Sequence, residues 1–341
     1  MSVQELDTPG PTVQSDVVGA LTLARRRVGE VAVSDWARAV RARDPVDTLK
    51  RGLHRPVICR AYYKLCEMQK LLPEPERTHK ILFLCEAPGG FFQAARRIYP
   101  NASRHVTSLV SGIDFNPMVK PSVVESLPFD GDIRRRAVTD TLSTTLGAHS
   151  MDLITGDGGT SHENLDLVEQ ASVTLLIAQT ACALKMQAPK GTFVVKIFEG
   201  STQVTQDIVS LLREVYKNVL LYKPKTSKAA NSERYVIARE LVDPQKASRY
   251  ADELFGSLDR GMYVHRLFDA PDPRVSKAFE ALAIKQIEEI DALIRATQTG
   301  DLSECYRKSK EDVSWMQVNV PCLSGCVARA IAPRSKRHKP A

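Results

Sequence analysis

The fold is decided by the stretch Lys80-Ile81-Leu82-Phe83-Leu84-Cys85-Glu86-Ala87-Pro88-Gly89-Gly90-Phe91-Phe92. Its first half, residues 80–85, is a short and nearly continuous apolar run, which is typical of a parallel strand buried on both faces. The two glycines after it let the backbone come close to a ligand, and a helix that opens there offers free N–H groups and the positive end of its dipole. The stretch therefore predicts a strand, a ligand-binding turn and a helix in direct succession.

Apolar runs and helical patterns alternate along the chain after this stretch. We expect helices at about 91–99, 164–188 and 205–216, and strands at about 104–110, 151–156, 192–198 and 218–222. This alternation predicts βαβ units and hence an α/β fold with a mostly parallel, doubly wound sheet. A last strand at about 234–239 follows its predecessor too closely for a crossover helix, so it should run antiparallel.

Helical segments flank the predicted sheet at both ends of the chain. Two helices, at about 17–43 and 56–72, precede the first strand, and beyond Leu241 the chain turns to helices joined by polar linkers. A helix at about 274–297 carries an apolar stripe, which should pack on the main domain rather than bind a partner. We divide the chain into an N-terminal tail and helical extension (1–54), an α/β domain (55–242), a helical C-terminal extension (243–332) and a basic tail (333–341).

The composition is that of an ordinary globular chain. Hydrophobic residues make up 43% and charged residues 26% of the 341 residues, and no stretch reaches the roughly 18 uninterrupted apolar residues that a membrane-spanning helix needs. We therefore expect no membrane partner. The net charge of +7 and the pI of about 9.0 are compatible with a polyanionic partner, although a basic cluster taken alone is usually a solvated surface.

Seven cysteines at irregular spacings do not form the pattern of a disulfide framework. The protein should therefore work in a reducing compartment, the cytoplasm or the nucleus. The close pair Cys322 and Cys326 has no second Cys or His pair at zinc-ligand spacing nearby. We expect two small buried side chains there and no metal.

The glycine turn does not match two common nucleotide-binding loops. No Gly-Lys-Ser or Gly-Lys-Thr follows it, as a Walker A loop requires, and it lacks the third glycine of the dinucleotide fingerprint. Phosphate binding of the NTPase kind is therefore disfavoured. We therefore interpret the glycine turn as a cradle for a nucleotide-like ligand of a different kind.

Five segments, taken together, carry a family resemblance. They are Arg60-Ala61-Tyr62-Tyr63-Lys64-Leu65, Glu86-Ala87-Pro88-Gly89-Gly90-Phe91, Gly156-Asp157-Gly158, Gly191-Thr192-Phe193-Val194-Val195-Lys196-Ile197-Phe198 and Ser232-Glu233-Arg234-Tyr235-Val236. In this order, over about residues 57–240, they resemble the FtsJ/RrmJ-type ribose 2′-O-methyltransferases, a family that includes ribosomal RNA enzymes and the cap-1 enzymes of eukaryotes and many viruses. The resemblance implies a Rossmann-like methyltransferase domain that uses S-adenosyl-L-methionine.

The same resemblance implies a catalytic tetrad and a set of cofactor contacts. Lys64, Asp157, Lys196 and Glu233 match the family's Lys-Asp-Lys-Glu tetrad. Cofactor contacts are implied for Glu86, Ala87, Pro88, Gly89, Gly90, Phe91, Asp132 and Asp157, with Asp132 expected to read the adenine amino group. The predicted strands agree on placement, because Asp157, Lys196 and Glu233 should meet at the carboxyl edge of the sheet.

The cofactor ribose has no evident ligand in the sequence. Many methyltransferases place an acid after the second strand, but the segment here is Thr107-Ser108-Leu109-Val110. Asp114 lies nearby and is a weak candidate. Ribose recognition is therefore a point where the chain departs from the common pattern.

The predicted chemistry needs a base beside an activated methyl group. A ribose hydroxyl is a poor nucleophile until its proton is removed, whereas the sulfonium methyl is already activated. A free lysine is charged at neutral pH, but burial and a second lysine nearby would lower its pKa. We expect Lys196 to accept the 2′-OH proton, Lys64 to lower the pKa of Lys196 and steer the hydroxyl, and Asp157 and Glu233 to align the two amines.

The substrate is open between three interpretations. The leading one is a cap-directed enzyme that acts on capped mRNA, of a type that viruses also use, for which the site of action would be the host cytoplasm or the virion. It rests on the variant Glu86-Ala87-Pro88 and on the long flanking regions. The alternatives are a ribosomal or transfer RNA methyltransferase and a catalytically inactive binding module. Lys223, Lys225 and Lys228 should flank the acceptor cleft and contact RNA phosphates, and the terminal extensions could receive a protein partner.

Overall fold

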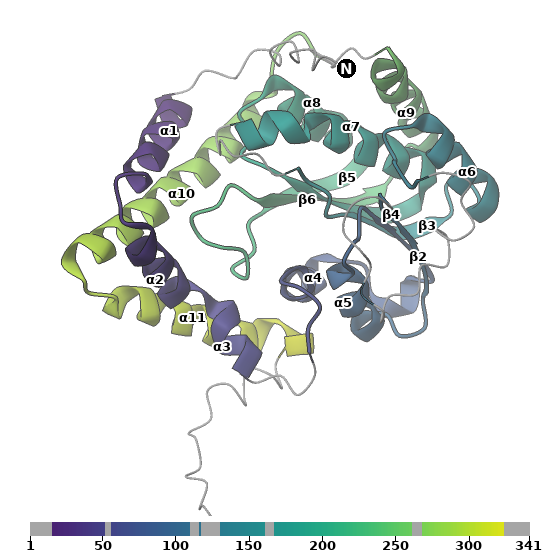
Figure 1. Ribbon diagram of the computed structural model, residues 1–341. Coiled ribbons are helices and arrows are strands. Elements are labelled where there is room, and N and C mark those ends of the chain that lie inside the picture. Colours follow the sequence, from purple (N-terminus) through teal and green to yellow (C-terminus); the bar gives the residue numbers. More distant parts are fainter. Residues whose placement is uncertain are drawn as a thin grey trace, which may run out of the picture.

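A six-stranded sheet forms the middle layer of the molecule (Figure 1). The structure, a computed structural model of the chain, describes residues 16–51, 56–109, 116, 130–160, 167–260 and 268–323. The strands are β1 (Lys80–Leu84), β2 (Ser103–Thr107), β3 (Met151–Gly156), β4 (Gln187–Ile197), β5 (Tyr216–Tyr222) and β6 (Arg234–Leu241). The predicted basic tail at 333–341, Asp114 and Cys326 lie outside the described residues.

The strand order is β2-β1-β3-β4-β6-β5. The pairs β1–β2, β1–β3 and β3–β4 are parallel, whereas β6 lies between β4 and β5 and is antiparallel to both. The predicted α/β class, the mostly parallel sheet and the antiparallel last strand are therefore confirmed. In the β4–β6 register Ile197 pairs with Arg234, so the start of β6 lies beside the end of β4.

Helices cover both faces of the sheet. One face carries α6 (Arg136–Leu146), α7 (Val168–Met186), α8 (Gln203–Val215) and α9 (Pro244–Asp259), and the other carries α4 (Ala61–Met68) and α5 (Gly90–Ile98). Two short 3-10 turns, η1 (Gln69–Leu71) and η2 (Pro75–Arg77), lead from α4 to β1.

The strand β1 shows why the sheet is the centre of the core. Leu82 and Leu84 pack in the cluster on the α7 face, and Ile81 and Phe83 pack in the cluster on the α4 face; all four side chains are fully buried. Each such burial contributes on the order of 2 kcal/mol to folding. Both faces of β1 are thus buried, as its continuous apolar sequence predicts.

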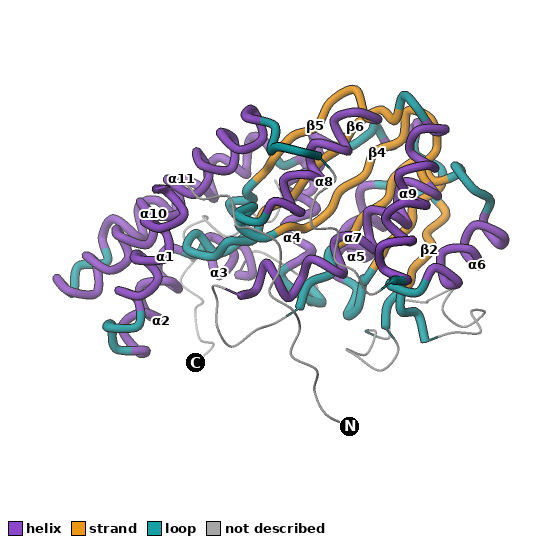
Figure 2. Tube along the Cα trace, turned by 90° about the horizontal axis from the view of Figure 1, so that it is seen from above, coloured by secondary structure: helices purple, strands orange, loops and turns teal. Residues whose placement is uncertain are grey.

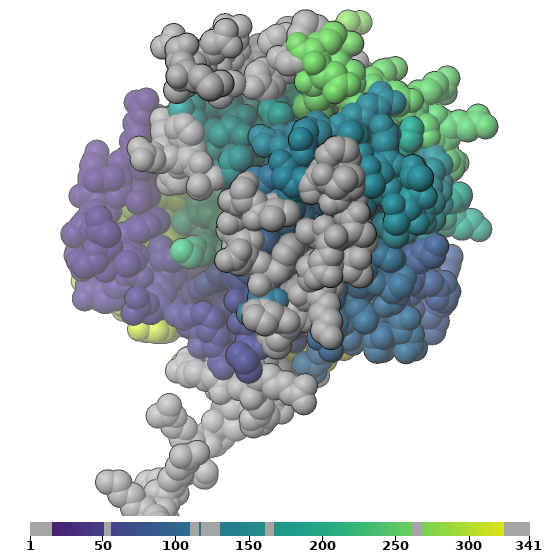
Figure 3. Space-filling model, turned by 45° about the vertical axis from the view of Figure 1, so that its right-hand side comes forward, coloured from purple at the N-terminus to yellow at the C-terminus, as the bar shows by residue number. Residues whose placement is uncertain are grey.

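A second helical body stands beside the α/β domain, and we call it the flanking bundle (Figures 1 and 2). It consists of α1 (Asp16–Val28), α2 (Val33–Arg43), α3 (Pro45–Arg51), α10 (Pro273–Thr299) and α11 (Ser303–Asn319). The two predicted extensions therefore meet in one body, although they lie at opposite ends of the sequence. In the space-filling view, the purple helices of the bundle and the blue and teal α/β domain lie on opposite sides of the visible face (Figure 3).

The N-terminal extension differs from its prediction. The expected helix at about 17–43 is broken, because α1 ends at Val28 and a turn at Gly29 and Glu30 separates it from α2. The break lets each half pack on a different part of α10: Leu21 and Ala24 of α1 contact the cluster around Ile290, whereas Ala39 and Ala42 of α2 pack with Leu293 and Ala296.

The stripe on α10 has a different main partner from the one we expected. Ala283, Ile290 and Ile294 are buried against α1 in the flanking bundle, and only the stripe's first residue, Phe279, joins the core of the α/β domain. The expected helix at about 56–72 is also shorter, since regular α-helix runs only from Ala61 to Met68. By contrast α9 packs on α7 and belongs with the main core.

Three further features characterise the described part of the chain. No helix there is long and apolar enough to cross a membrane. Within the same residues, no group of His, Cys, Asp or Glu side chains is arranged to hold a metal ion. The six described cysteines are free thiols, and Cys322 is buried.

Candidate active site

The turn after β1 begins with a buried carboxylate. The Glu86 Oε1 atom accepts the backbone N–H of Phe92 at 2.8 Å, and so caps the start of α5. Burial raises the pKa of Glu86 well above its usual range. The Glu86 side chain therefore faces α5 and positions the turn. Its role in the structure is thus to hold the turn, whereas the resemblance implied a contact with the cofactor.

The rest of the turn is built around its glycines. Gly89 has a φ of 116°, in the left-handed region that favours glycine. A Cβ on Gly90 would lie 2.5 Å from Cys59 Sγ and 2.8 Å from Ala61 Cβ, so only glycine lets α5 begin against the start of α4. Ala87 and Pro88 are joined by a cis peptide bond at the head of the turn.

Phe91 completes the turn with its main chain. Its ring is fully buried and packs against Tyr235, with 5.9 Å between the ring centroids. Only the backbone of Phe91 could therefore reach a ligand at this turn. The contact that the family resemblance implies for Phe91 is therefore one that its main chain would make, and the ring fixes the turn to β6.

Asp132 lies beside the end of β2. A Cβ on the preceding Gly131, whose φ is 78°, would lie 2.1 Å from the Ser108 carbonyl oxygen, so the two segments touch. The Asp132 carboxylate accepts Arg134 Nε at 2.8 Å and Arg134 Nη2 at 2.6 Å. These hydrogen bonds lower the pKa of Asp132, and an adenine amino group would have to share the carboxylate with Arg134.

The first half of the tetrad is a pair at the ends of β3 and β4. Lys196 Nζ lies 3.4 Å from Asp157 Oδ1. The same Oδ1 accepts the Tyr235 hydroxyl at 2.6 Å, and the Tyr235 side chain is fully buried. A Cβ on Gly159 would lie 3.0 Å from Lys196 Cε, so the turn after Asp157 is held close to the lysine stem.

The second half of the tetrad joins α4 to the start of β6. Lys64 Nζ is 2.7 Å from Glu233 Oε1 and 2.8 Å from Oε2, and both residues are buried. Ser227 Oγ donates a further hydrogen bond of 2.8 Å to Glu233 Oε1. Lys64 Nζ also lies 5.9 Å from the centre of the Tyr235 ring, which stands between the two ion pairs.

The charges of the two pairs act on one another. Burial alone would raise the pKa of Glu233, but Lys64 and Lys196 together hold it well below its usual range. Burial alone would lower the pKa of Lys196, yet Asp157 and Glu233 raise it above its usual value. Our expectation that the pKa of Lys196 is lowered was therefore wrong for this arrangement, because each lysine has a carboxylate as its nearest charged neighbour.

The three lysines before Glu233 do not share one environment. Lys223 is turned inward, where its Nζ donates to the carbonyl oxygens of Asn231 at 2.7 Å and Glu233 at 2.9 Å. Burial lowers the pKa of Lys223 to about 7. Lys223 is therefore not placed to contact a phosphate, which corrects the grouping made from the sequence.

The other two lysines of this group remain at the surface. Lys225 is partly exposed, but its Nζ is 2.6 Å from Asp312 Oδ1 and 5.5 Å from the centre of the Trp315 ring. Lys228 is exposed. Of the three lysines that we predicted to contact RNA phosphates, Lys228 is thus the one whose exposed position is most compatible with such a contact.

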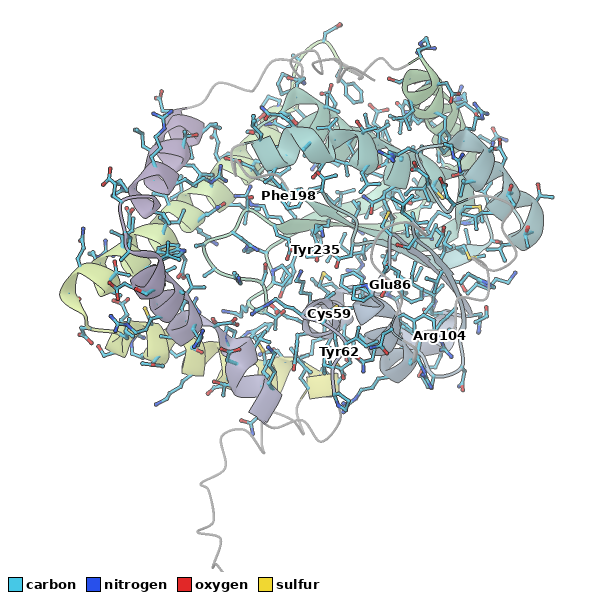
Figure 4. The ribbon with its side chains drawn as sticks, in the orientation of Figure 1. Cys59, Tyr62, Glu86, Arg104, Phe198 and Tyr235 are labelled. Carbon is cyan, nitrogen blue, oxygen red and sulfur yellow. The ribbon has the colours of Figure 1, made fainter. Side chains whose placement is uncertain are left out.

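Two residues of the site were missed from the sequence. Tyr235 binds Asp157 and Ser227 binds Glu233, as described above. Tyr235 could have been found, because residues 233 and 235 face the same side of a strand; Ser227 reaches Glu233 only through the folding of its loop. Figure 4 shows Tyr235, Phe198, Glu86 and Cys59 around the middle of the molecule, where β6, β4, β1 and the start of α4 meet.

The chain matches the model of one protein family, FtsJ-like methyltransferase, over residues 57–241. This match covers more than half of the chain and includes all four tetrad positions. The chain belongs to the FtsJ-like methyltransferase family. The FtsJ-like membership confirms the predicted enzyme class, an S-adenosylmethionine-dependent methyltransferase of the type that modifies RNA ribose.

Named relatives agree with the family match. Ribosomal RNA large subunit methyltransferase E of Bordetella avium is 28% identical over 191 residues, which cover 54% of this chain and 83% of the relative. The pre-rRNA 2′-O-ribose RNA methyltransferase FTSJ3 of Pongo abelii is 27% identical over 201 residues, 58% of this chain and 22% of the relative. This FtsJ-like chain therefore matches only about a fifth of the length of FTSJ3.

A solved structure is similar to about half of the chain. It is a Plasmodium falciparum protein assigned as a ribosomal RNA methyltransferase, with 21% identity and a TM-score of 0.43, covering 54% of this chain and 97% of that one.

The FtsJ-like site has the groups that S-adenosylmethionine needs. The turn at Gly89 opens α5 at the carboxyl end of β1, so the free backbone N–H groups of that helix start lie at this edge of the sheet, and the Asp157 carboxylate follows β3 at the same edge. A carboxylate at this edge suits a positively charged cofactor. The residues present therefore fit the cofactor of the family.

Proposed function

We propose that the chain transfers the methyl group of S-adenosylmethionine to a ribose 2′-hydroxyl of ribosomal RNA. The relatives from Bordetella avium and Pongo abelii bear names that specify ribosomal RNA. They support the ribosomal alternative better than the cap-directed, viral interpretation, for which the variant Glu86-Ala87-Pro88 is the main argument. Capped mRNA is the competing substrate.

The observation that carries the proposal is the meeting of two ion pairs around Tyr235. Lys64 with Glu233 and Lys196 with Asp157 come from four separate segments, yet all lie at one edge of the sheet. A domain that only binds RNA has no physical need for one buried and one half-buried lysine–carboxylate pair side by side, since burying ion pairs seldom adds stability. The arrangement therefore favours catalysis over the inactive binding module.

In the proposed mechanism, Lys196 accepts the proton of the 2′-hydroxyl. S-adenosylmethionine supplies a methyl group on a positively charged sulfur, which needs no further activation by the protein. Lys196 Nζ is held at the edge of the sheet by Asp157, and Asp157 is held in turn by the Tyr235 hydroxyl. This chain of contacts fixes the direction from which the lysine approaches the hydroxyl.

Lys64 has a different part in the mechanism. Its ammonium is bound by both oxygens of Glu233 and donates from the α4 side of the site. It would hydrogen-bond the ribose oxygen and stabilise the negative charge that develops there as the proton leaves. Glu233 then keeps Lys64 charged and in place, while Lys196 does the proton transfer.

Labelled S-adenosylmethionine tests the substrate. The chain is incubated with ribosomal RNA, transfer RNA, and matched capped and uncapped RNAs, and the labelled nucleotide is mapped by nuclease digestion. We expect label at one ribose in ribosomal RNA, and none after a 2′-deoxy nucleotide replaces it. Label that depends on the cap would return the cap-directed interpretation, and label on a base would overturn ribose methylation.

A further inference from the structure

The segment that leads to Glu233, residues 223–233, is held from two sides, and we call it the Glu233 loop. On the side of the α/β domain, buried Glu67 of α4 binds its first half. Glu67 Oε1 accepts the backbone N–H of Lys225 at 2.7 Å, and Oε2 accepts the N–H and the hydroxyl of Thr226, each at 2.8 Å. This contact fixes the loop beside the helix that carries Lys64.

On the other side, the flanking bundle binds the same half of the loop through an ion network. Asp312 of α11 is only slightly exposed and accepts Lys225 Nζ at 2.6 Å. Its second oxygen accepts Arg43 Nη1 of α2 at 2.7 Å, and Arg43 also binds Glu289 of α10 at 3.1 Å. Three helices of the bundle therefore share one ion network with the Glu233 loop, in which Asp312 is the most buried member and Lys225 is partly exposed.

The second half of the loop is bound by Gln286 of α10. The Gln286 Nε2 atom donates to the Ala230 carbonyl oxygen at 3.0 Å, and its Oε1 atom accepts Arg234 Nη2 at 3.2 Å. Arg234 directly follows Glu233 and has an exposed fraction of 1%, while Gln286 has 4%. One buried amide thus holds the backbone three residues before Glu233 and the side chain one residue after it.

These contacts converge on the catalytic carboxylate. Within the loop, Ser227 Oγ donates to Glu233 Oε1 at 2.8 Å, and Ser227 directly follows Thr226. Ser227 donates one of the hydrogen bonds that Glu233 accepts, and its position depends on the segment that Glu67 and Asp312 bind. The flanking bundle lies outside residues 57–241, the part that matches the FtsJ-like family.

We propose that the flanking bundle positions Glu233 for catalysis, with Gln286 and Asp312 as its positioning residues. The inference rests on the proposed function, since it assigns a task to the bundle in that same reaction. The loop has no helix or strand of its own between β5 and β6, so its backbone is restricted by a few internal hydrogen bonds, such as those of Lys223, and by the contacts from α4 and the flanking bundle. A displacement of about 1 Å in a catalytic group can lower the rate about a hundredfold.

The test compares variants of the full chain that differ in whether they touch the loop. Gln286→Leu removes both amide contacts, and Asp312→Asn removes the charge that faces Lys225 and Arg43. Asp291→Asn is the matched control, because Asp291 also lies on α10 and pairs with Arg27 of α1, at 2.5 Å, without contacting the loop. Asp312→Glu keeps the charge and serves as the conservative rescue.

Two readouts separate positioning from general destabilisation. We expect Gln286→Leu and Asp312→Asn to lower kcat about tenfold or more, with the KM for S-adenosylmethionine unchanged and with faster hydrogen exchange confined to residues 223–233. Asp291→Asn should match the wild-type chain in both, and Asp312→Glu should recover most of the activity. Wild-type kcat in the two loop variants, or an equal loss in the control, would overturn the inference.

Failure of the proposed function would look different. In that case the wild-type chain transfers no methyl group to any of the RNAs, and the positioning role for catalysis falls with it. If instead the wild-type chain is active while exchange and kcat are unchanged in the loop variants, the proposed function stands and only the inference is refuted.

Discussion

The raised pKa of Lys196 makes a prediction about how methyl transfer depends on pH. A base must be neutral to accept a proton, and Asp157 and Glu233 hold the pKa of Lys196 above its ordinary value of 10.5, despite the opposing effect of burial. At pH 7.5, a lysine with a pKa of 10.5 is neutral in about one molecule in a thousand. As long as the pH stays below the pKa, the neutral fraction of the lysine increases about tenfold for each unit by which the pH is raised.

We therefore expect the single-turnover rate of methyl transfer to rise with a slope of about one in log rate against pH, from pH 7 to pH 9.5. Short incubations at saturating RNA and labelled S-adenosylmethionine measure it. Glu233→Gln removes one of the two charges that raise the pKa of Lys196, so any residual activity should reach its plateau at lower pH. A wild-type rate that is flat above pH 7 would refute proton transfer to a lysine held in this way.

Three further predictions concern single side chains. Tyr235→Phe removes a hydrogen bond to the charged Asp157; it should cost on the order of 2 kcal/mol and lower both the thermal midpoint and kcat, and an unchanged midpoint would mean that the bond contributes nothing. Lys228→Ala should lower the salt dependence of RNA binding by about 0.7 in log–log slope if Lys228 contacts a phosphate; an unchanged slope would make it a solvated residue. The depressed pKa of Glu233 stabilises the fold above its ordinary pKa of 4.5, and this stabilisation is lost as the pH falls toward the pKa of the folded state. The free energy of unfolding, measured with urea, should therefore be lower at pH 3 than at pH 5 by on the order of 2 kcal/mol. Glu233→Gln should lack this difference.

The sheet could be predicted from sequence because its signals are local. The run at 151–156 is mostly apolar and bounded by polar residues, and β3 has the same limits. The short connection before β6 determines its antiparallel direction, since no crossover helix fits there. Strands buried on both faces thus leave a continuous pattern that needs no knowledge of their neighbours.

The flanking bundle could not be predicted in the same way. The apolar stripe on α10 was visible, but its contact with α1 joins residues more than 200 positions apart in the sequence, as the pair Arg27 and Asp291 shows. No local pattern states which stripe meets which. The turn at Gly29, by contrast, has a local signal, because three arginines in the last turn of α1 are followed by glycine; the prediction of one helix at about 17–43 left it out.

The site shows the same division between local and distant causes. Strand ends place Asp157, Lys196 and Glu233 at one edge, which the sequence indicates. The direction of Lys223 depends on how the Glu233 loop folds back on Asn231, and the pKa of Lys196 depends on two carboxylates from other segments. Both expectations failed because they considered only the lysines themselves. They left out the groups that each lysine binds in the folded chain, the loop carbonyl oxygens for Lys223 and the two carboxylates for Lys196.

The central claim is that Lys196 removes the ribose proton, and one comparison tests it most directly. Single-turnover transfer of labelled methyl to ribosomal RNA is measured for the wild-type chain, for Lys196→Ala and for Lys217→Ala, a control lysine that lies exposed on β5 and pairs with Glu240, together with calorimetric binding of S-adenosylmethionine. We predict that Lys196→Ala loses transfer while it still binds the cofactor, and that Lys217→Ala keeps both. Transfer at the wild-type rate by Lys196→Ala would contradict the account.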